Sequence, residues 1–288
     1  MDNQLKTAAL LAALSGLLIA ISTRIIGGST GLIIGIAIAA ATNLVSWYQS
    51  DKIALAAYRA QPVSPSDAPG LYRMVERLSS KANIPTPRVY IVPGSNANAF
   101  ATGRDPENAA VAVTEGILKI LPEQELEAVL AHELTHIINR DTLTQAVSAT
   151  IAGAISFLAQ MVSYSLLFGG NSRNGSRGGN PLGILLTVIL SPLAASVIQL
   201  AISRTREFSA DAGAAKLTGN PRALARALQR LDSSARQMPM QGNPAFEPLL
   251  IINPLSGEFL GNLFRTHPST EARIKALLKI EQQLPTTV

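Results

Sequence analysis

The segment from Pro122 to Asp141 reads PEQELEAVLAHELTHIINRD, and we expect it to form the helix around which the fold is built. Proline suits the first turn of a helix, and acidic residues at positions 123 and 125 suit the positive end of the helix dipole. Apolar residues recur at helical spacing and predict one buried face on this helix. They are Leu126, Val129, Leu130, Leu134 and Ile137.

Residues 132–136 within this helix match the pattern H-E-x-x-H. Because residues four apart share one helix face, His132 and His136 can both reach a single Zn²⁺. Glu133 then lies beside the remaining coordination position, where it can act as a base toward water. The chain has only three histidines, so a chance match has odds of roughly one in a thousand. The pattern predicts a catalytic zinc site.

A catalytic zinc usually has three protein ligands, so one more is expected elsewhere in the chain. There is no cysteine, and the remaining histidine is His267. Glu207 and Asp211 lie four residues apart and share one helix face. Alone, such a pair is more often a solvated surface. Beside an incomplete zinc site, we interpret Glu207 as the third ligand and Asp211 as the group that orients a histidine. His267 is the alternative ligand.

The composition indicates that part of the chain lies in lipid. Hydrophobic residues make up 47% and charged residues 15%, and the mean hydropathy is +0.24. A membrane-spanning helix needs about 20 apolar residues. Four stretches carry no charged residue: Thr7–Thr23, Ile25–Ser50, Thr142–Asn171 and Gly178–Ser203. The second and fourth are long enough, the first needs its flanks, and the third contains several polar residues.

Two alternatives apply to these stretches. The first could be a cleaved signal peptide, although an acidic residue stands near its start. The third and fourth could form a buried helical pair in a soluble core. Basic residues outnumber acidic ones by 24 to 19, but no Lys/Arg-rich run is present. We therefore expect contact with the bilayer rather than with nucleic acid, because basic groups commonly flank spans.

The charge pattern divides the chain into four parts. We expect an N-terminal transmembrane hairpin at 1–50 and a catalytic segment at 51–141. A second transmembrane pair follows at 142–203, with a flexible loop at 169–180, and a C-terminal catalytic segment at 204–288 carries the third ligand. The first polar segment shows a helical pattern at 71–78 and β-like runs at 88–92 and 109–114. The fold class is mainly α, an α+β zincin-like catalytic domain with a small β-sheet joined to transmembrane helices.

Several motifs resemble the HtpX-type membrane zinc metalloproteases, which are relatives of the CAAX prenyl protease. They are the SNANAFATG run at 95–103, AVTEG at 112–116, residues 132–141, REFSAD at 206–211 and HPSTE at 267–271. The resemblance covers nearly the whole chain. It implies one zinc per chain, Glu207 as third ligand and Asp211 as partner of His132. It also implies a stress-response protease in the cell inner membrane, with a cytoplasmic catalytic domain that cleaves damaged or misassembled membrane proteins.

The resemblance also suggests roles around the zinc. The run Asn98-Ala99-Phe100-Ala101 resembles the edge strand that pairs with an extended substrate, although it would also suit an ordinary loop. His267 resembles a histidine that assists the oxyanion, or it has a structural role before Pro268. Arg273 resembles its companion arginine.

The pattern that follows the second histidine also matches the family. Asn139 and Asp141 belong to it, and either could orient a zinc ligand or cap the helix end.

The reaction expected from these residues is endoproteolysis of membrane-protein substrates. The rival hypothesis is a non-catalytic membrane scaffold stabilised by zinc, but a structural site normally has a fourth protein ligand. An intramembrane active site is opposed by the charged residues around 123–127 and 140–141. We expect the zinc at the membrane surface, on helices continuous with the spans. Basic residues after the second and fourth stretches favour the cytoplasmic side, and Arg24, Arg173 and Arg177 oppose this orientation.

Overall fold

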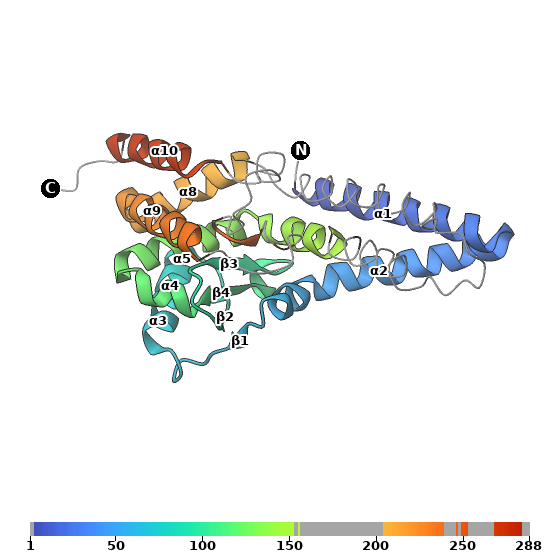
Figure 1. Ribbon diagram of the computed structural model, residues 1–288, viewed down its shortest axis with the longest axis horizontal. Helices are drawn as coiled ribbons and strands as arrows, with labels where there is room; N and C mark the ends of the chain where they lie inside the picture. Colours follow the sequence, from blue (N-terminus) through green and yellow to red (C-terminus); the bar gives the residue numbers. More distant parts are fainter. Residues whose placement is uncertain are drawn as a thin grey trace, which may run out of the picture.

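The computed structural model describes residues 3–152, 155, 204–238, 246, 249–252 and 268–283. An arm of two long helices extends from a compact body, which holds a small sheet and several shorter helices (Figure 1). The fourth apolar stretch, the loop at 169–180 and His267 lie outside the described residues, as does most of the third stretch. The fold class is confirmed: the described chain is mostly helical with one small mixed sheet.

The arm is a hairpin of α1 (Asn3–Ile26) and α2 (Gly28–Ala57). The face of α2 that contacts α1 carries small residues, among them Gly31, Gly35 and Ala39. A Cβ atom at Gly31 would lie 2.8 Å from the Ser22 carbonyl oxygen, so the two backbones approach too closely for any larger residue. Small residues at this spacing are typical of helix pairs that pack inside membranes.

The opposite face of α2 is apolar and exposed. Its exposed large residues are Leu32, Ile33, Ile34, Ile36, Ile38, Leu44 and Val45, followed by Trp47 and Tyr48. Within the described residues, α2 alone is long and apolar enough to cross a membrane, and α1 holds a shorter apolar part at Thr7–Ala20. A face this apolar suits lipid, and the two aromatic residues suit the boundary with water.

The four-stranded sheet has the order β1-β2-β4-β3. Its strands are β1 (Gln61–Pro62), β2 (Arg88–Val92), β3 (Ala99–Thr102) and β4 (Ala110–Thr114). The predicted strands at 88–92 and 109–114 appear as β2 and β4, which pair in parallel. The strand β3 pairs antiparallel with β4 at one edge of the sheet. The pairing of β1 with β2 was not predicted from the sequence.

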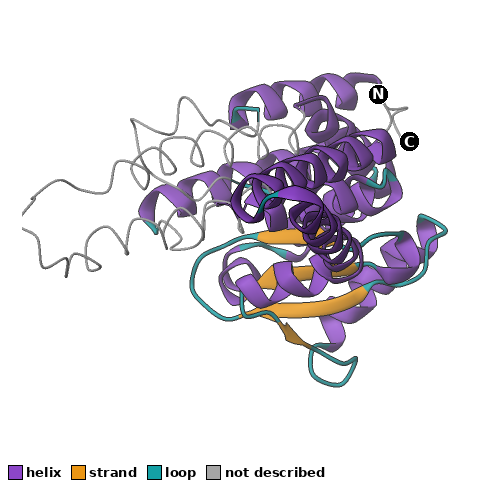
Figure 2. Cartoon of the chain, turned by 90° about the vertical axis from the view of Figure 1, so that its right-hand side faces the viewer, coloured by secondary structure: helices purple, strands orange, loops and turns teal. Residues whose placement is uncertain are grey.

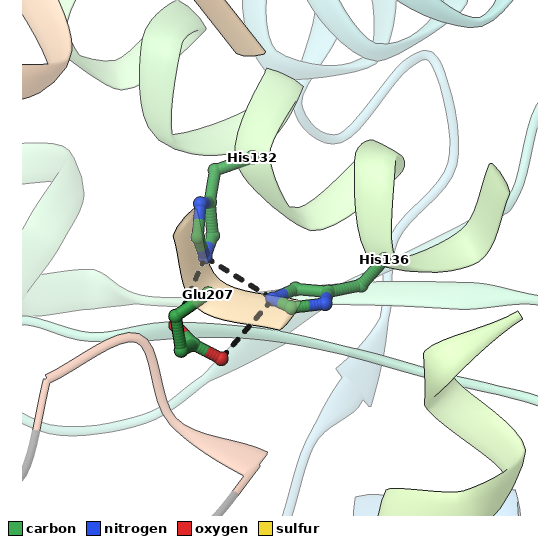
Figure 3. A group of neighbouring side chains, drawn as sticks. All are labelled: His132, His136 and Glu207. Atoms are coloured by element: carbon green, nitrogen blue, oxygen red, sulfur yellow. Dashed lines mark hydrogen bonds and ion pairs between the residues drawn. The ribbon is translucent and has the colours of Figure 1, made fainter. Parts of the chain in front are cut away.

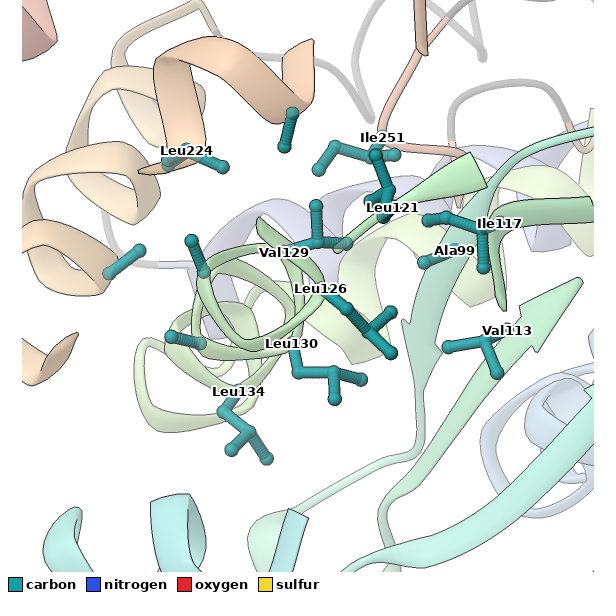
Figure 4. Packing of buried hydrophobic residues seen from close by; sticks show 14 of the residues in the cluster. Ala99, Val113, Ile117, Leu121, Leu126, Val129, Leu130, Leu134, Leu224 and Ile251 are labelled. Atoms are coloured by element: carbon teal, nitrogen blue, oxygen red, sulfur yellow. The ribbon is translucent and has the colours of Figure 1, made fainter. Parts of the chain in front are cut away.

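Helices lie over one face of the sheet (Figure 2), and residues at the base of α2 pack on the other. The first layer contains α3 (Pro69–Lys81), α4 (Glu115–Ile120) and α5 (Glu123–Ile138). Side chains of α3, α4 and α5 share a core with inward residues of the sheet, such as Val113 (Figure 4). On the other face, Phe100 packs in a second core with Leu55 of α2 and with Ala149 and Ala152.

Three C-terminal helices complete the body: α8 (Arg204–Thr218), α9 (Pro221–Gln237) and α10 (Thr270–Gln283). Both α8 and α9 contact α5, and α10 packs on α8 and α9. The expectation that the histidine helix runs on into the next span is wrong. Helix α5 ends at Ile138, and Arg140 adopts a left-handed conformation with φ 56° before the chain becomes helical again at 141–152.

Gly213 sets the distance between α8 and α5. A Cβ atom at this position would overlap the side chain of Thr135 and would lie 2.8 Å from its hydroxyl oxygen. The Thr135 side chain is buried and bonds to the Ala131 carbonyl, so it has little room to move. The two helices therefore approach closely at Thr135, which lies between His132 and His136 in the sequence.

We predict that Gly213→Ala lowers the free energy of unfolding by about 1–3 kcal/mol, because overpacking forces the buried neighbours apart. This loss should exceed the gain in helix propensity from removing a glycine. Gly70→Ala is the matched control, since a Cβ atom there meets nothing within 4 Å. Chemical denaturation of the two variants should separate them, and equal stability would contradict the close packing of α8 on α5.

Candidate metal centre

The structure brings His132, His136 and Glu207 together from two helices, as the sequence predicts (Figure 3). The Nε2 atoms of the two histidines are 3.2 Å apart. Glu207 Oε2 lies 3.6 Å from His132 Nε2, and Glu207 Oε1 lies 3.5 Å from His136 Nε2. All three side chains are buried. Three potential ligand atoms therefore converge on one point between α5 and α8.

The spacing of these atoms fits a tetrahedral zinc site. Ligands at about 2.0–2.1 Å from a tetrahedral ion lie about 3.3 Å from one another. The two Nε2 atoms are 3.2 Å apart, and each has one oxygen of Glu207 at 3.5–3.6 Å, Oε2 for His132 and Oε1 for His136. Two imidazoles and one carboxylate also form a donor set that catalytic zinc uses, with the fourth position left for water or substrate. The residues present thus suit a catalytic rather than a closed structural site.

Each histidine is oriented through its other ring nitrogen by a carboxylate. His132 Nδ1 lies 3.0 Å from Asp211 Oδ1, and His136 Nδ1 lies 2.9 Å from Asp141 Oδ2. Such contacts fix the tautomer and ring orientation, so that Nε2 faces the metal position. Asp141 can reach back to His136 because the left-handed conformation of Arg140 interrupts the helix directly after α5. The sequence alone did not decide whether Asp141 orients a zinc ligand or caps the end of the helix.

Arg273 of α10 holds Asp211 in place. Its Nε and Nη2 atoms donate to the two oxygens of Asp211 at 2.9 and 2.7 Å, and Nη1 donates to the Ile251 carbonyl at 3.0 Å. Nη1 also lies 3.8 Å from Glu207. The guanidinium is 1% exposed, so these contacts neutralise a fully buried charge. The sequence suggested that Arg273 is a companion of the histidine that assists the oxyanion, and this role stays a prediction.

Burial and neighbouring charges shift the pKa values of the centre. Burial lowers the pKa of His132, but contacts with Asp211 and Glu207 outweigh it and raise the pKa to about 9. Burial raises the pKa of Glu133, while the adjacent histidines act in the opposite direction. No side chain in the described parts of the chain hydrogen-bonds to the Glu133 carboxylate. Glu133 is therefore available to accept and hold a proton.

Two other predicted residues lie further from the centre. Asn139 is exposed at the C-cap of α5, and its amide donates to the Ser209 hydroxyl at 3.5 Å. Asn98 is buried, and its amide donates to the Ile252 carbonyl. The assignment of His267 to the oxyanion stays a prediction. The contribution of Ile251 was missed, because a backbone carbonyl leaves no signal in the sequence.

Comparisons with known proteins agree with this geometry. Residues 65–281 match the family described as Peptidase family M48. The chain is 79% identical over 286 residues to a Protease HtpX homolog of Nostoc punctiforme, covering 99% of both chains. It is 64% identical over 282 residues to another from Acaryochloris marina, covering 98% of this chain and 96% of that one.

A solved structure with a similar fold is the crystal structure of Ste24p from S. mikatae. The TM-score is 0.50 at 20% identity, and the match covers 95% of this chain. The chain spans 64% of the length of Ste24p. At this identity the likeness concerns the fold alone.

We predict that Asp211→Asn and Asp141→Asn each lower zinc affinity by roughly 10- to 100-fold, because each removes the carboxylate that orients one histidine. Competition with a chromogenic chelator measures this affinity directly. Asp232→Asn is the control, since Asp232 pairs with Arg236 on the surface of α9. Unchanged affinity in Asp141→Asn would show that its contact with His136 is not needed to position the ring.

Proposed function

Because the chain belongs to Peptidase family M48, we propose that it is a zinc-dependent endoprotease of membrane-protein quality control. The chain is a membrane metalloprotease, as its family, its relatives and its apolar hairpin indicate. Zinc as the metal, the cytoplasmic orientation and damaged or misassembled membrane proteins as substrates are the proposed parts. The observation that carries the proposal is the convergence of three ligand atoms, one from each residue, within 4.8 Å of one another and next to Glu133.

His132, His136 and Glu207 would hold the zinc. Bound there, the metal would act as a Lewis acid toward water and the scissile carbonyl. Glu133 follows His132 directly on α5 and is buried, and the raised pKa of its carboxyl suits a group that takes a proton and then delivers it to the leaving amine. Asp211 and Asp141 hold the imidazoles in one orientation, and Arg273 keeps Asp211 ionised by its charge and hydrogen bonds.

The fold supports a site close to the bilayer. Helix α5 ends only two residues before the helical segment 141–152, whose Leu143, Val147 and Ile151 pack with Leu11 and Leu14 of α1. At the base of α2, Tyr58 packs against Phe100 with ring centroids 5.1 Å apart and the ring planes tilted by 45°. The sheet beside the metal centre thus packs directly against the apolar hairpin. A protease built this way would reach substrate segments near the membrane surface first.

The edge strand β3 supports substrate pairing by strand addition. It lies at the end of the sheet order and contacts α5, which carries both histidines. Its residue Ala101 is small, so another backbone could approach its outer edge at this position. An extended segment laid there would pass beside the metal ligands. All four residues of β3 are buried, so entry of a substrate requires that this edge become accessible.

We predict that Glu133→Gln keeps zinc and abolishes proteolysis, because an amide cannot act as the base. Zinc content and cleavage of a membrane-protein substrate in proteoliposomes are measured on the same preparation. Glu127→Gln is the matched control on the same helix, where Glu127 pairs with Arg77 at the surface. A fully active Glu133→Gln variant would refute the mechanism. A wild-type protein that binds zinc but cleaves nothing would favour the rival scaffold.

The orientation can be tested by labelling, because the chain has no native cysteine. We predict that single cysteines at Ser80 and Ser233 react only with reagent added from the cytoplasmic side, since both positions are exposed on the catalytic body. Cysteines at their buried neighbours Ser79 and Ser234 serve as controls that should react poorly. Labelling of the two exposed positions from the opposite side would place the catalytic body outside the cytoplasm.

A further inference from the structure

The register of β3 determines which of its backbone groups a substrate could use. The Thr114 N–H donates to the Asn98 carbonyl, so Asn98 forms a hydrogen-bonded pair with β4. Along two antiparallel strands, hydrogen-bonded residue pairs alternate with pairs that are not hydrogen-bonded. The backbone N–H and C=O groups of Phe100 and Thr102 therefore also point toward β4. The N–H and C=O groups of Ala99 and Ala101 consequently face the outer edge. These are the two residues that could pair with an added strand.

Both outward groups of Ala99 are already used by the chain itself. The Ala99 carbonyl accepts a hydrogen bond from the Ile251 N–H at 3.1 Å. The Ala99 N–H donates to the side-chain oxygen of Asn98 at 3.1 Å. The amide of Asn98 also donates to the Ile252 carbonyl at 3.0 Å. A substrate strand would find no free donor or acceptor at this position.

Ile251 is fixed from its other side as well. Its carbonyl accepts from Arg273 at 3.0 Å, and its side chain is 2% exposed in the same core as Ala99 and Leu121 (Figure 4). Displacing Ile251 would expose a large apolar side chain and would leave a buried guanidinium nitrogen without this acceptor. A substrate that replaced it would recover only the single bond to Ala99. Ile251 is therefore a fixed part of the site and not a displaceable plug.

Ala101 differs from Ala99 in this respect. It is 2% exposed, and no group in the described residues bonds to its outward N–H or C=O. Buried backbone groups are almost always paired, so two that are not are suited to an added strand. Beyond Ala101, the Gly103 carbonyl accepts from the Thr142 hydroxyl at 2.8 Å. The edge is thus occupied on both sides of Ala101.

We propose that Ile251 and Ile252 close the substrate-pairing edge of β3 at Ala99, and that an extended substrate is recognised through the backbone of Ala101 alone. The inference rests on the proposed endoprotease function and defines its specificity. Only one substrate N–H, the one donated to the Ala101 carbonyl, contributes to strand pairing. The enzyme then selects a short extended segment rather than a long β-strand.

A backbone N-methyl scan tests this directly. A peptide that the wild-type enzyme cleaves is synthesised in versions that each carry a methyl group on one backbone amide. The affinity of each methylated peptide is measured for zinc-loaded Glu133→Gln, which is expected to retain zinc without cleaving. We expect one amide whose methylation weakens binding at least roughly tenfold, with its neighbours nearly unaffected. Two sensitive amides two residues apart would overturn the proposal, because they would show pairing at both Ala99 and Ala101.

A variant pair tests the role of Ile251. Ile251→Pro removes the N–H that Ala99 accepts while keeping the carbonyl that Arg273 uses, and Ile251→Val keeps both. In Ile251→Pro only, we expect that methylation of a second peptide amide, two residues from the first, also weakens binding. Both substitutions are made in the Glu133→Gln background, with zinc content and melting temperature as folding checks. A folded Ile251→Pro protein with an unchanged scan would overturn the proposal.

The outcomes separate this inference from the function on which it rests. If Ile251→Pro does not fold, the scan on the parent protein decides alone. Failure of the wild-type enzyme to cleave any unmethylated peptide or membrane protein would refute the endoprotease function, and the inference with it. If the wild-type enzyme cleaves its substrate but the scan finds two amides whose methylation weakens binding, only the closure of the β3 edge at Ala99 is refuted.

Discussion

The buried pair between Asp211 and Arg273 is the interaction on which the rest of the site depends. It joins α8 to α10, orients His132 and holds Ile251 against the sheet. Burying two charges is costly, and the cost is offset only when geometry and hydrogen bonds are complete. Here the guanidinium donates twice to one carboxylate and once to a carbonyl. Loss of either partner would leave a buried charge beside the metal ligands.

The metal centre is assembled from segments that are distant in the chain. His132 and His136 come from one helix, and Glu207 comes from another that follows most of the apolar sequence. Close packing at Gly213 lets the second helix approach the first. The apolar hairpin contributes through Tyr58 and Phe100, which join α2 to the edge strand. The apolar hairpin and the metal centre are therefore parts of one packed unit.

Local patterns predicted the parts of the fold that depend on periodicity and spacing. Helix α5 follows from its apolar repeat, and the histidine pair follows from a separation of four residues. Glu207 and Asp211 were found because zinc chemistry required a further ligand. The break at Asn139 and Arg140 was missed, since a left-handed arginine has no clear sequence signal. Ile251 was missed for a different reason: it acts through its backbone, which every residue carries.

Zinc X-ray absorption on purified wild-type protein and on Glu207→Ala would test the proposed ligand set most directly. The wild-type spectrum should fit two imidazole nitrogens and carboxylate oxygen at about 2.0–2.2 Å. In Glu207→Ala, the carboxylate contribution should disappear and zinc occupancy should fall, while both imidazoles remain wherever zinc is still bound. A spectrum and zinc stoichiometry that do not change in Glu207→Ala would contradict the site assembled between α5 and α8.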